Sequence, residues 1–521
     1  MTMPRLLQNG RRRGLMVVTL VTLVQGAAAG VAAFATRGLF DAMAAQAALP
    51  PGLLVALAAS GVLIAGARVL SRLTGERLGQ DYALAIRLAL LDHASGMPAS
   101  AVARRRSGYM SLRFVGDMTA FRDWLGKGVP RLIAAAVMIP AACTVLWWLE
   151  PRLALVIAPL FAATLAILAL AGPRLEPLHR RLRARRARIA AEMAERMPLA
   201  PELDRMGRRR AELRQLRKRT ERMIRAALHR LGWAESLKAL PDAVAGLAAC
   251  AVIVTGVQSG AGTGTIAGAL AVIGLVLNPL RDLASVWNFR AAYLAARNKA
   301  VAALARDQRN TGQGDRRLPK GPVEVMVRDL PAPSGAVLSL EIPAGQRRTL
   351  NCDPSDADTL FSALCGLEKL APGHITLSGI CLSDLSRGSL RRGVHLVTST
   401  PMVLKGSLRR NLAVGLSSRP SDDTLEQAAL RAGLAGLMHR IDGLDGALTE
   451  GGRSLSATER SALSLARLLL GHPQLVLLGD ALWHLDHEAG AVLAAHLEAT
   501  GPTILRHPAL ARKAMVGPLA A

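Results

Sequence analysis

The sequence predicts an α-helical membrane domain followed by a cytoplasmic α/β domain. Six long apolar windows occupy the first three hundred residues, and short apolar strands alternate with helical stretches after residue 323. Between them, residues 306–322 read RDQRNTGQGDRRLPKGP, which is polar, contains Gly and Pro, and has no periodicity. We therefore expect a membrane domain over residues 1–305, a linker over 306–322 and a second domain over 323–521.

The six windows are almost free of charged residues, and with their flanks most reach the roughly 20 residues that cross a bilayer. They cover residues 16–34, 53–69, 132–148, 153–171, 244–257 and 266–277. The first window follows Arg5 and Arg11 to Arg13, so a cleaved signal peptide is the alternative interpretation. Its apolar run is longer than the usual signal core, which favours a retained first transmembrane helix.

The distribution of arginine predicts the orientation in the membrane. The segments around residues 39–52, 150–152 and 258–264 are short and hold one basic residue, Arg152, whereas residues 72–129 and 174–238 are long and rich in arginine. Basic loops stay on the cytoplasmic side of a membrane, so we expect the two long loops to be cytoplasmic. The protein is expected to be an integral protein of a bacterial-type inner or plasma membrane. With six crossings, both termini and the second domain are expected to be cytoplasmic.

The net charge of +27 raises the possibility of nucleic-acid binding. Residues 174–230 carry 19 Lys and Arg against 7 Asp and Glu, which is nearly half of that excess. This stretch has no interleaved aromatic residues and no nucleic-acid motif, and it joins two membrane windows, so we expect it to face anionic lipid. The five cysteines show no CxxC spacing, and the sequence contains no recognisable metal cluster.

Both long loops contain a break in their helical pattern. In the first, Gly96, Met97 and Pro98 interrupt the helix and precede the basic turn at residues 104–108. In the second, Pro198 and Pro201 interrupt a basic helix. Each break alone is compatible with an ordinary connection between helices.

The best-defined stretch of the second domain covers residues 455–486. Ser456 can cap a helix over residues 460–470, and Gly471 and Pro473 end that helix. An apolar strand over residues 475–478 then leads to Gly479 and Asp480. Open α/β sheets place their ligand chemistry at this end of a strand.

This stretch resembles the second half of an ABC-type ATPase domain. The family's LSGGQ signature corresponds to residues 455–459, LSATE, and its Asp-Glu pair after the strand corresponds to Gly479 and Asp480. By the same resemblance, Ser399 takes the Q-loop position, Asp486 the D-loop position and His507 the switch-histidine position. For His507, a purely structural role is an equal alternative. The resemblance extends over residues 14–508 to half-size ABC exporters, which implies coupling helices near residues 98–102 and 198–206.

The phosphate-loop positions have changed most. Residues 364–367, LCGL, resemble the family's LxGL helix end and place the GxxxxGK[ST] pattern on residues 351–358. Pro354 removes a backbone donor, and Asp353 adds a carboxylate. The substituted family positions are Asn351 and Asp356 for two glycines, Ala357 for the lysine and Asp358 for the hydroxyl.

These substitutions predict that the loop does not bind a nucleotide. We expect the three carboxylates to face the place of the polyphosphate, where each repulsion at about 5 Å costs roughly 3 kcal/mol at an effective dielectric constant of about 20. A cation held by Asp358 is the alternative. No metal site is otherwise predicted.

The resemblance implies the non-catalytic half of a heterodimeric exporter. A second ABC half-transporter would then supply the catalytic motifs, and ATP with Mg²⁺ would bind at a composite site. This chain would lend Ser456, Ala457, Thr458, Glu459 and Asp486 to that site. For Ser456, a plain helix cap is the alternative.

The apolar windows are compatible with an amphipathic or lipid-like cargo, because ionisable residues are nearly absent from them. The rival hypothesis is a membrane scaffold or regulator that keeps the fold without transport. The expected partners are therefore the second half-transporter, the lipid bilayer and the cargo, with no nucleic acid.

Overall fold

Six long helices carry the apolar windows of the sequence. The computed structural model describes residues 3–8, 10–103, 117–416, 418 and 420–507. Within these residues, six helical stretches are long and apolar enough to cross a membrane, which confirms the predicted windows. They are α1 (Arg11–Ala44), α2 (Pro51–Ser95), α5 with η2 and α6 (Met118–Asp123, Trp124–Gly128, Val129–Leu149), α7 with η3 and α8 (Pro151–Ala171, Gly172–Arg174, Leu175–Arg196), α10 (Arg209–Gln258) and α11 (Thr263–Leu304).

The described residues form two compact units. Those within Met1–Ser95 and Arg105–Arg306 make up the first unit, and those within Gly96–Arg104 and Asp307–Ala521 the second. The second unit therefore includes a short helix from the first long loop, α3 (Ala99–Ala103), which lies at the predicted coupling position. The basic turn predicted at residues 104–108 lies outside the described residues.

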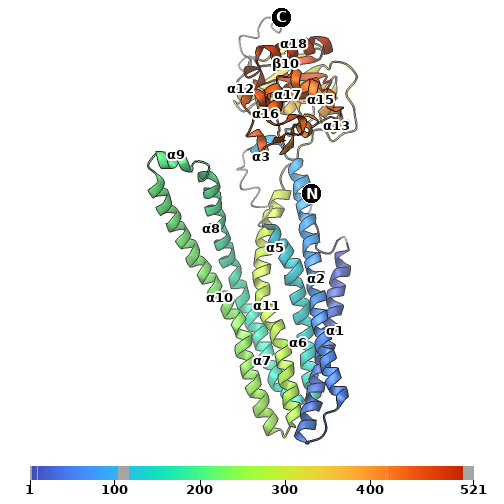
Figure 1. The fold of residues 1–521 in the computed structure, drawn as a ribbon, viewed down its shortest axis with the longest axis vertical. Coiled ribbons are helices and arrows are strands. Elements are labelled where there is room, and N and C mark those ends of the chain that lie inside the picture. Colours follow the sequence, from blue (N-terminus) through green and yellow to red (C-terminus); the bar gives the residue numbers. More distant parts are fainter. Residues whose placement is uncertain (1–2, 9, 104–116, 417, 419, 508–521) are drawn as a thin grey trace. The chain divides into compact units, whose positions relative to one another are not determined.

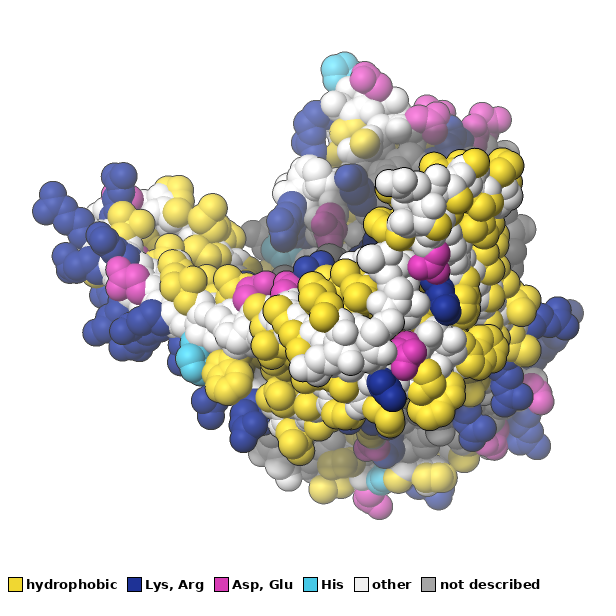
Figure 2. All heavy atoms as spheres, turned by 90° about the horizontal axis from the view of Figure 1, so that it is seen from below, with side chains coloured by type: hydrophobic (Ala, Val, Ile, Leu, Met, Phe, Trp, Pro, Cys, Tyr) yellow, Lys and Arg dark blue, Asp and Glu magenta, His cyan; other side chains and the backbone are white. Residues whose placement is uncertain are grey.

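A helical hairpin in the first unit carries the second predicted coupling element. Helices α8 and α10 run side by side and are joined by α9 (Ala200–Arg205), as Figure 1 shows. Arg196 of α8 pairs with Glu212 of α10 at 2.5 Å. In the end-on view of Figure 2, Lys and Arg side chains gather on the arm at the left, whereas hydrophobic side chains dominate the rest of the visible face. The hairpin is therefore basic, as the arginine-rich loop predicted.

Glycine permits a close approach between α2 and the segment before α6. A Cβ added to Gly75 would lie 2.5 Å from the carbonyl oxygen of Gly126, and one added to Gly126 would lie 2.9 Å from the carbonyl oxygen of Gly75. The backbones therefore pack directly against each other, which residues without a side chain permit. A Cβ added to Gly66, on the same helix, would meet no other described atom within 4 Å.

The second unit contains two four-stranded sheets. The parallel sheet has the order β3-β10-β9-β6, with β3 (Arg347–Thr349), β10 (Thr503–Arg506), β9 (Leu475–Leu478) and β6 (Val394–Val397). All four residues of β9 are buried, as expected for a parallel strand covered on both faces. The antiparallel sheet has the order β2-β1-β4-β5, with β2 (Val337–Ile342), β1 (Val325–Pro331), β4 (Ile375–Leu377) and β5 (Ile380–Cys381).

Helices cover and connect these sheets. A two-stranded antiparallel sheet of β7 (Gly406–Ser407) and β8 (Ala447–Leu448) completes the strands of the described residues. The helices are α12 (Pro354–Leu364), α13 (Arg387–Gly393), α14 (Leu408–Leu412), α15 (Asp422–Arg431), α16 (Ala435–Arg440), η4 (Gly443–Asp445), η5 (Glu450–Gly452), α17 (Ala457–Leu469), η6 (Asp480–Trp483) and α18 (His487–Thr500).

The segment predicted as a linker packs against the second unit instead of hanging free. Thr311 is buried and donates a hydrogen bond to the carbonyl of Gly366 at 2.7 Å, and the Asn310 side chain bonds the backbone of Leu370. Helix α3 is fixed to the same region. The Ala99 amide donates to the carbonyl of Leu367, and both the amide and the hydroxyl of Ser100 donate to Glu368.

Replacing Gly75 by Ala should destabilise the membrane unit, because the added methyl group meets a backbone atom that cannot turn aside. We expect a loss of about 1–3 kcal/mol, seen as a lower unfolding midpoint of the protein in detergent. Gly66→Ala is the matched control on the same helix, and its midpoint should be unchanged or slightly higher. Equal midpoints for the two variants would contradict the backbone contact.

Candidate functional site

The loop between β3 and α12 is short. Helix α12 begins at Pro354, so only residues 350–353 separate it from the strand. Of the positions matched to a phosphate loop, Asn351 lies in this connection, whereas Asp356, Ala357 and Asp358 lie in the first turns of the helix. Proline at the first helical position removes one of the backbone N–H groups that a helix terminus offers to an anion.

Asp356 does not face the expected phosphate position. Its side chain is 2% exposed, and its two oxygens accept hydrogen bonds from the amide of Ser334 at 3.1 Å and from the Ser334 hydroxyl at 2.6 Å. Ser334 belongs to the turn between β1 and β2. The expectation that all three carboxylates line the phosphate position is therefore wrong for Asp356, which links α12 to this turn.

Ala357, at the lysine position, is fully buried. It belongs to a hydrophobic cluster that includes Leu360 and Phe361 of the same helix and Leu477 of β9. The side chain at this position therefore points into the core of the unit.

Asp358 is exposed and lies within electrostatic range of two other predicted site residues. Partial burial raises the pKa of Asp358, the charge of Asp480 raises it further, and His507 lowers it. Asp358 and Asp480 thus repel each other when both are ionised. Among the described residues, no group of three or more His, Cys, Asp or Glu is placed to hold a metal ion.

Asp480, at the catalytic glutamate position, is held by the loop at the Q-loop position. One carboxylate oxygen accepts hydrogen bonds from the Ser399 amide at 2.8 Å and the Thr398 hydroxyl at 2.9 Å, and the other accepts one from the Ser399 hydroxyl. Partial burial acts to raise the pKa of Asp480, but these hydrogen bonds outweigh it and lower the pKa below its usual value. The carboxylate is therefore ionised and structurally engaged.

The same loop is fixed on its other side by α17 and α14. Arg460 donates to the carbonyl of Ser399 at 3.1 Å, and Arg467 donates to the carbonyl of Met402 at 2.9 Å. Burial lowers the pKa of Arg467 to about 10, so this arginine remains charged at neutral pH. Buried Asn411 bonds both the amide and the carbonyl of Leu404.

His507 contacts the loop before α12. Its Nε2 lies 2.5 Å from the carbonyl oxygen of Cys352, so Nε2 carries the proton and donates. The side chain is 2% exposed, and Nδ1 has no hydrogen-bond partner among the described residues. His507 therefore links the end of β10 to this loop through a hydrogen bond to a backbone carbonyl.

Ser456 and Glu459 form a reciprocal cap at the start of α17. The Ser456 hydroxyl accepts from the Glu459 amide at 3.1 Å, and the Glu459 carboxylate accepts from the Ser456 amide at 2.8 Å. Arg440 forms an ion pair with Glu459 at 2.9 Å. Burial acts to raise the pKa of Glu459, but the bonds from Arg440 and Ser456 prevail and lower it.

The other residues matched to the composite site lie at helix starts. Ala457 and Thr458 form the first turn of α17, where Thr458 is exposed. Asp486 caps α18, since its carboxylate accepts from the Ala489 amide at 2.8 Å. In the described part of the chain, these residues share no hydrogen bond or ion pair with Asp480, Thr398 or Ser399.

Several structurally important residues were missed by sequence reasoning. Thr398, Arg440 and Asn411 reach their partners across 82, 19 and 7 residues of sequence, and no local pattern indicates such contacts. Arg460 directly follows Glu459 of the capping pair. Its position towards the buried side of an amphipathic helix could have indicated that it bonds a group within the domain.

Comparison with known proteins agrees with this architecture. The family model of the ABC transporter transmembrane region matches residues 15–276, half of the chain, and the ABC transporter family model for the ATP-binding domain matches residues 358–482. The second match implies a domain of a class that binds ATP, typically with Mg²⁺.

Curated relatives include transporters of several kinds. An ATP-dependent lipid A-core flippase of Thiobacillus denitrificans is 24% identical over 81% of this chain and 75% of its own length. The uncharacterized ABC transporter ATP-binding protein YwjA of Bacillus subtilis is 34% identical over 31% of this chain, and the match spans only 28% of that relative. The glutathione/L-cysteine transport protein CydC of Bacillus subtilis is 34% identical over 25% of this chain and 23% of its own length. With a matched transmembrane region over half its length and a matched ATPase domain behind it, the chain belongs to the ABC transporter family.

Proposed function

We propose that this chain is the non-catalytic half of a heterodimeric ABC exporter. The observation that carries the proposal is the state of Asp480, whose carboxylate is engaged by Thr398 and Ser399. A general base must reach the attacking water with a free lone pair, and three hydrogen bonds already hold this carboxylate in place, two on one oxygen and one on the other. A carboxylate one methylene shorter than glutamate is also less able to reach that water.

The residues at the phosphate-loop positions do not fit a triphosphate with Mg²⁺. The lysine position is occupied by buried Ala357, the helix begins with a proline, and exposed Asp358 adds a negative charge beside Asp480. None of the residues described at these positions supplies the positive charge or the convergent N–H groups that hold phosphates. Energy must then enter through a composite site completed by a partner with an intact phosphate loop.

This chain would contribute contacts from its signature segment, residues 455–459, and from Asp486. The Ser456 hydroxyl accepts its hydrogen bond from Glu459, so its own proton remains available to a γ-phosphate oxygen. Its amide, however, already donates to Glu459, so the contact with phosphate would rest on the hydroxyl alone. Helices α3 and α9 would act as the coupling elements, with α9 reaching the partner.

The cargo that we propose is amphipathic or lipid-like. The apolar windows contain few ionisable residues, and relatives over most of the chain include a lipid A-core flippase. We further propose that transport is outward. Both termini and the second unit would lie in the cytoplasm, because the positive-inside rule places the arginine-rich loops on that side.

A scaffold without transport activity is the second candidate, and the reciprocal cap of Ser456 and Glu459 favours it. In that cap, the Ser456 hydroxyl and the Glu459 carboxylate accept from backbone amides of the helix terminus, Arg440 neutralises Glu459, and no phosphate is needed there. The two candidates differ in whether Ser456 affects the activity of the complex.

Ser456→Ala separates these candidates. We expect the ATPase activity of the reconstituted complex to fall several-fold, because the partner's nucleotide loses a hydroxyl contact. Loss of the cap itself costs about 1 kcal/mol, so Ser421→Ala is the matched control, since Ser421 caps α15 in the same domain in the same way. If the two variants have the same activity, the scaffold hypothesis is favoured.

The purified chain alone should show no ATPase activity above background, and Asp480→Asn should change the activity of the complex by less than about twofold. Phosphate release measured for the chain, the partner and the complex tests both statements. Robust activity of the chain alone that is abolished by Asp480→Ala would overturn the assignment of a non-catalytic subunit.

Restoring the lysine should not restore nucleotide binding. Ala357→Lys places a charged side chain in a fully buried position, so we expect a loss of roughly 2–4 kcal/mol in stability and no binding of a fluorescent ATP analogue. Asp358→Lys, at an exposed position of the same helix, should leave the unfolding midpoint nearly unchanged. A stable, ATP-binding Ala357→Lys variant would show that the loop retains the phosphate-binding geometry.

A further inference from the structure

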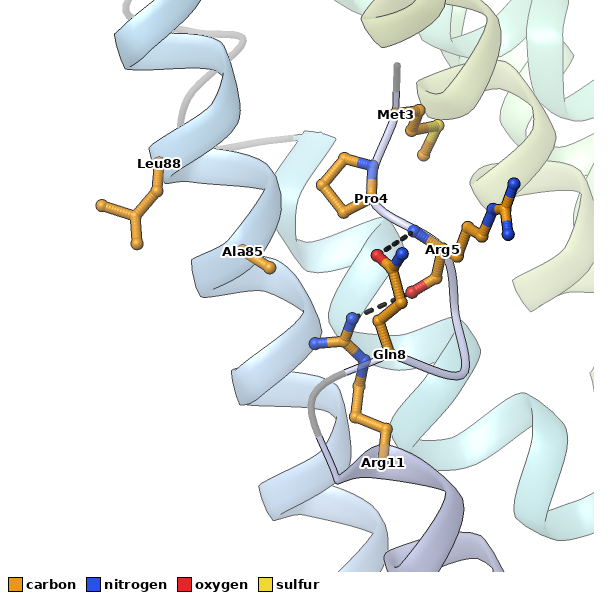
Figure 3. Close-up of a pocket in the computed structure, with 7 residues that line it drawn as sticks. All are labelled: Met3, Pro4, Arg5, Gln8, Arg11, Ala85 and Leu88. Atoms are coloured by element: carbon orange, nitrogen blue, oxygen red, sulfur yellow. Dashed lines mark hydrogen bonds between the residues drawn. The ribbon is translucent and has the colours of Figure 1, made fainter. Parts of the chain in front are cut away.

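A pocket of about 610 Å³ lies where the N-terminal segment passes α2. Residues of that segment line one side, and Ala85 and Leu88 of α2 line the other, with the Leu88 side chain directed away from the segment; Arg11 lies at the start of α1 (Figure 3). Of the described residues, no acidic side chain lines this pocket. Every residue that lines it belongs to the first unit.

Arg11 is a buried cation without an acidic partner in the described part of the chain. It is 3% exposed, its Nε donates to the carbonyl of Leu6 at 2.9 Å, and one terminal nitrogen donates to the carbonyl of Arg5 at 2.9 Å. Its guanidinium carbon lies 5.5 Å from the centre of the Tyr82 ring. Among the described residues, no carboxylate lies within ion-pair distance of it.

Two carbonyls and an aromatic face orient this guanidinium but do not neutralise its charge. A guanidinium has five N–H donors, and the hydrogen bonds to Leu6 and Arg5 use two of them. A buried charge normally has a counter-ion, because removing it from water is costly. The pocket beside Arg11 is therefore suited to an anion that accepts several hydrogen bonds, and a phosphate group has this chemistry.

The start of α1, which carries Arg11, favours a lipid as the source of the phosphate, although Ala85 and Leu88 belong to the loop predicted to be cytoplasmic. Arg12 and Arg13 are exposed next to it, and the first apolar window begins only a few residues later, with Met16 and Leu20 more than 60% exposed. Exposed apolar side chains on a membrane helix face hydrocarbon, so the start of α1 lies at the depth of the lipid headgroups.

We propose that this pocket binds the phosphate headgroup of an anionic membrane lipid, with Arg11 as the central ligand. Leu88 forms the exposed rim on α2, and the N-terminal segment, held by Arg11 itself, forms the opposite side. The lipid would fasten the N-terminal segment to α2. The site depends on the membrane domain alone and is independent of the proposed heterodimer.

Introducing a carboxylate at the rim tests the site without removing Arg11. For the full chain in detergent, we expect fluorescent phosphatidylglycerol to bind in preference to phosphatidylcholine, and Leu88→Glu to weaken phosphatidylglycerol binding about tenfold by charge repulsion. Leu91→Glu is the matched control. Leu88 and Leu91 are 59% and 61% exposed on the same helix, but Leu91 does not line the pocket.

Equal binding by the Leu88→Glu and Leu91→Glu variants, or equal binding of the two lipids, would overturn the proposal. Inorganic phosphate that competes as well as soluble lipid headgroups would assign the pocket to a free anion and overturn the lipid assignment. As a second variant, Arg11→Lys keeps the charge and loses the planar donor pattern, so binding should weaken less than in Arg11→Gln.

Discussion

The hydrogen bonds between Asp480 and the loop at residues 398–399 are the interaction on which the site depends. They join the end of β9 to the end of β6, which are neighbouring strands of the parallel sheet. Arg460 and Arg467 tie the same loop to α17, and Asn411 ties it to α14. The polar groups at the edge of the parallel sheet thus satisfy one another. This arrangement stabilises the domain without a ligand, because these buried or half-buried polar groups already have partners.

Charge distinguishes this network from a phosphate-binding site. A phosphate loop keeps several N–H donors unpaired and a lysine nearby, and these groups destabilise the protein when no nucleotide is bound. Binding of the polyanion offsets this cost in free energy. Here the helix starts with Pro354, Ala357 lies in the core, and Asp356 bonds Ser334. The side chains of Ala357 and Asp356 thus pack or pair internally. Asp358 and Asp480 remain as two repelling carboxylates, and the pKa of Asp358 is raised in part by this repulsion.

The sequence was sufficient where the physical signal is local. The apolar windows predicted the six helices, the all-apolar run at residues 475–478 predicted the buried strand β9, and the Ser456-x-x-Glu459 spacing lay at the start of a helix that the structure caps reciprocally. The sequence was insufficient where the partner of a side chain lies far away in the sequence. Asp356 was expected to face the phosphate position because the resemblance aligned it with a glycine of the phosphate loop, but it lies in α12 and bonds Ser334, 22 residues away. The packing of residues 307–316 on the second unit depends on contacts such as Thr311 to Gly366, which composition does not reveal.

A domain fixed in this way can still transmit force. Helix α3 belongs to the second unit and is bonded to Glu368 and Leu367, which directly follow α12 and its loop. Movement of α12 and the sheet therefore carries α3 with it, and α3 is joined through three residues to the end of α2. A rigid internal network favours such transmission, because strain spreads through packed and hydrogen-bonded elements without local rearrangement. The non-catalytic role proposed above is thus compatible with a helix α3 that remains bonded to the second unit.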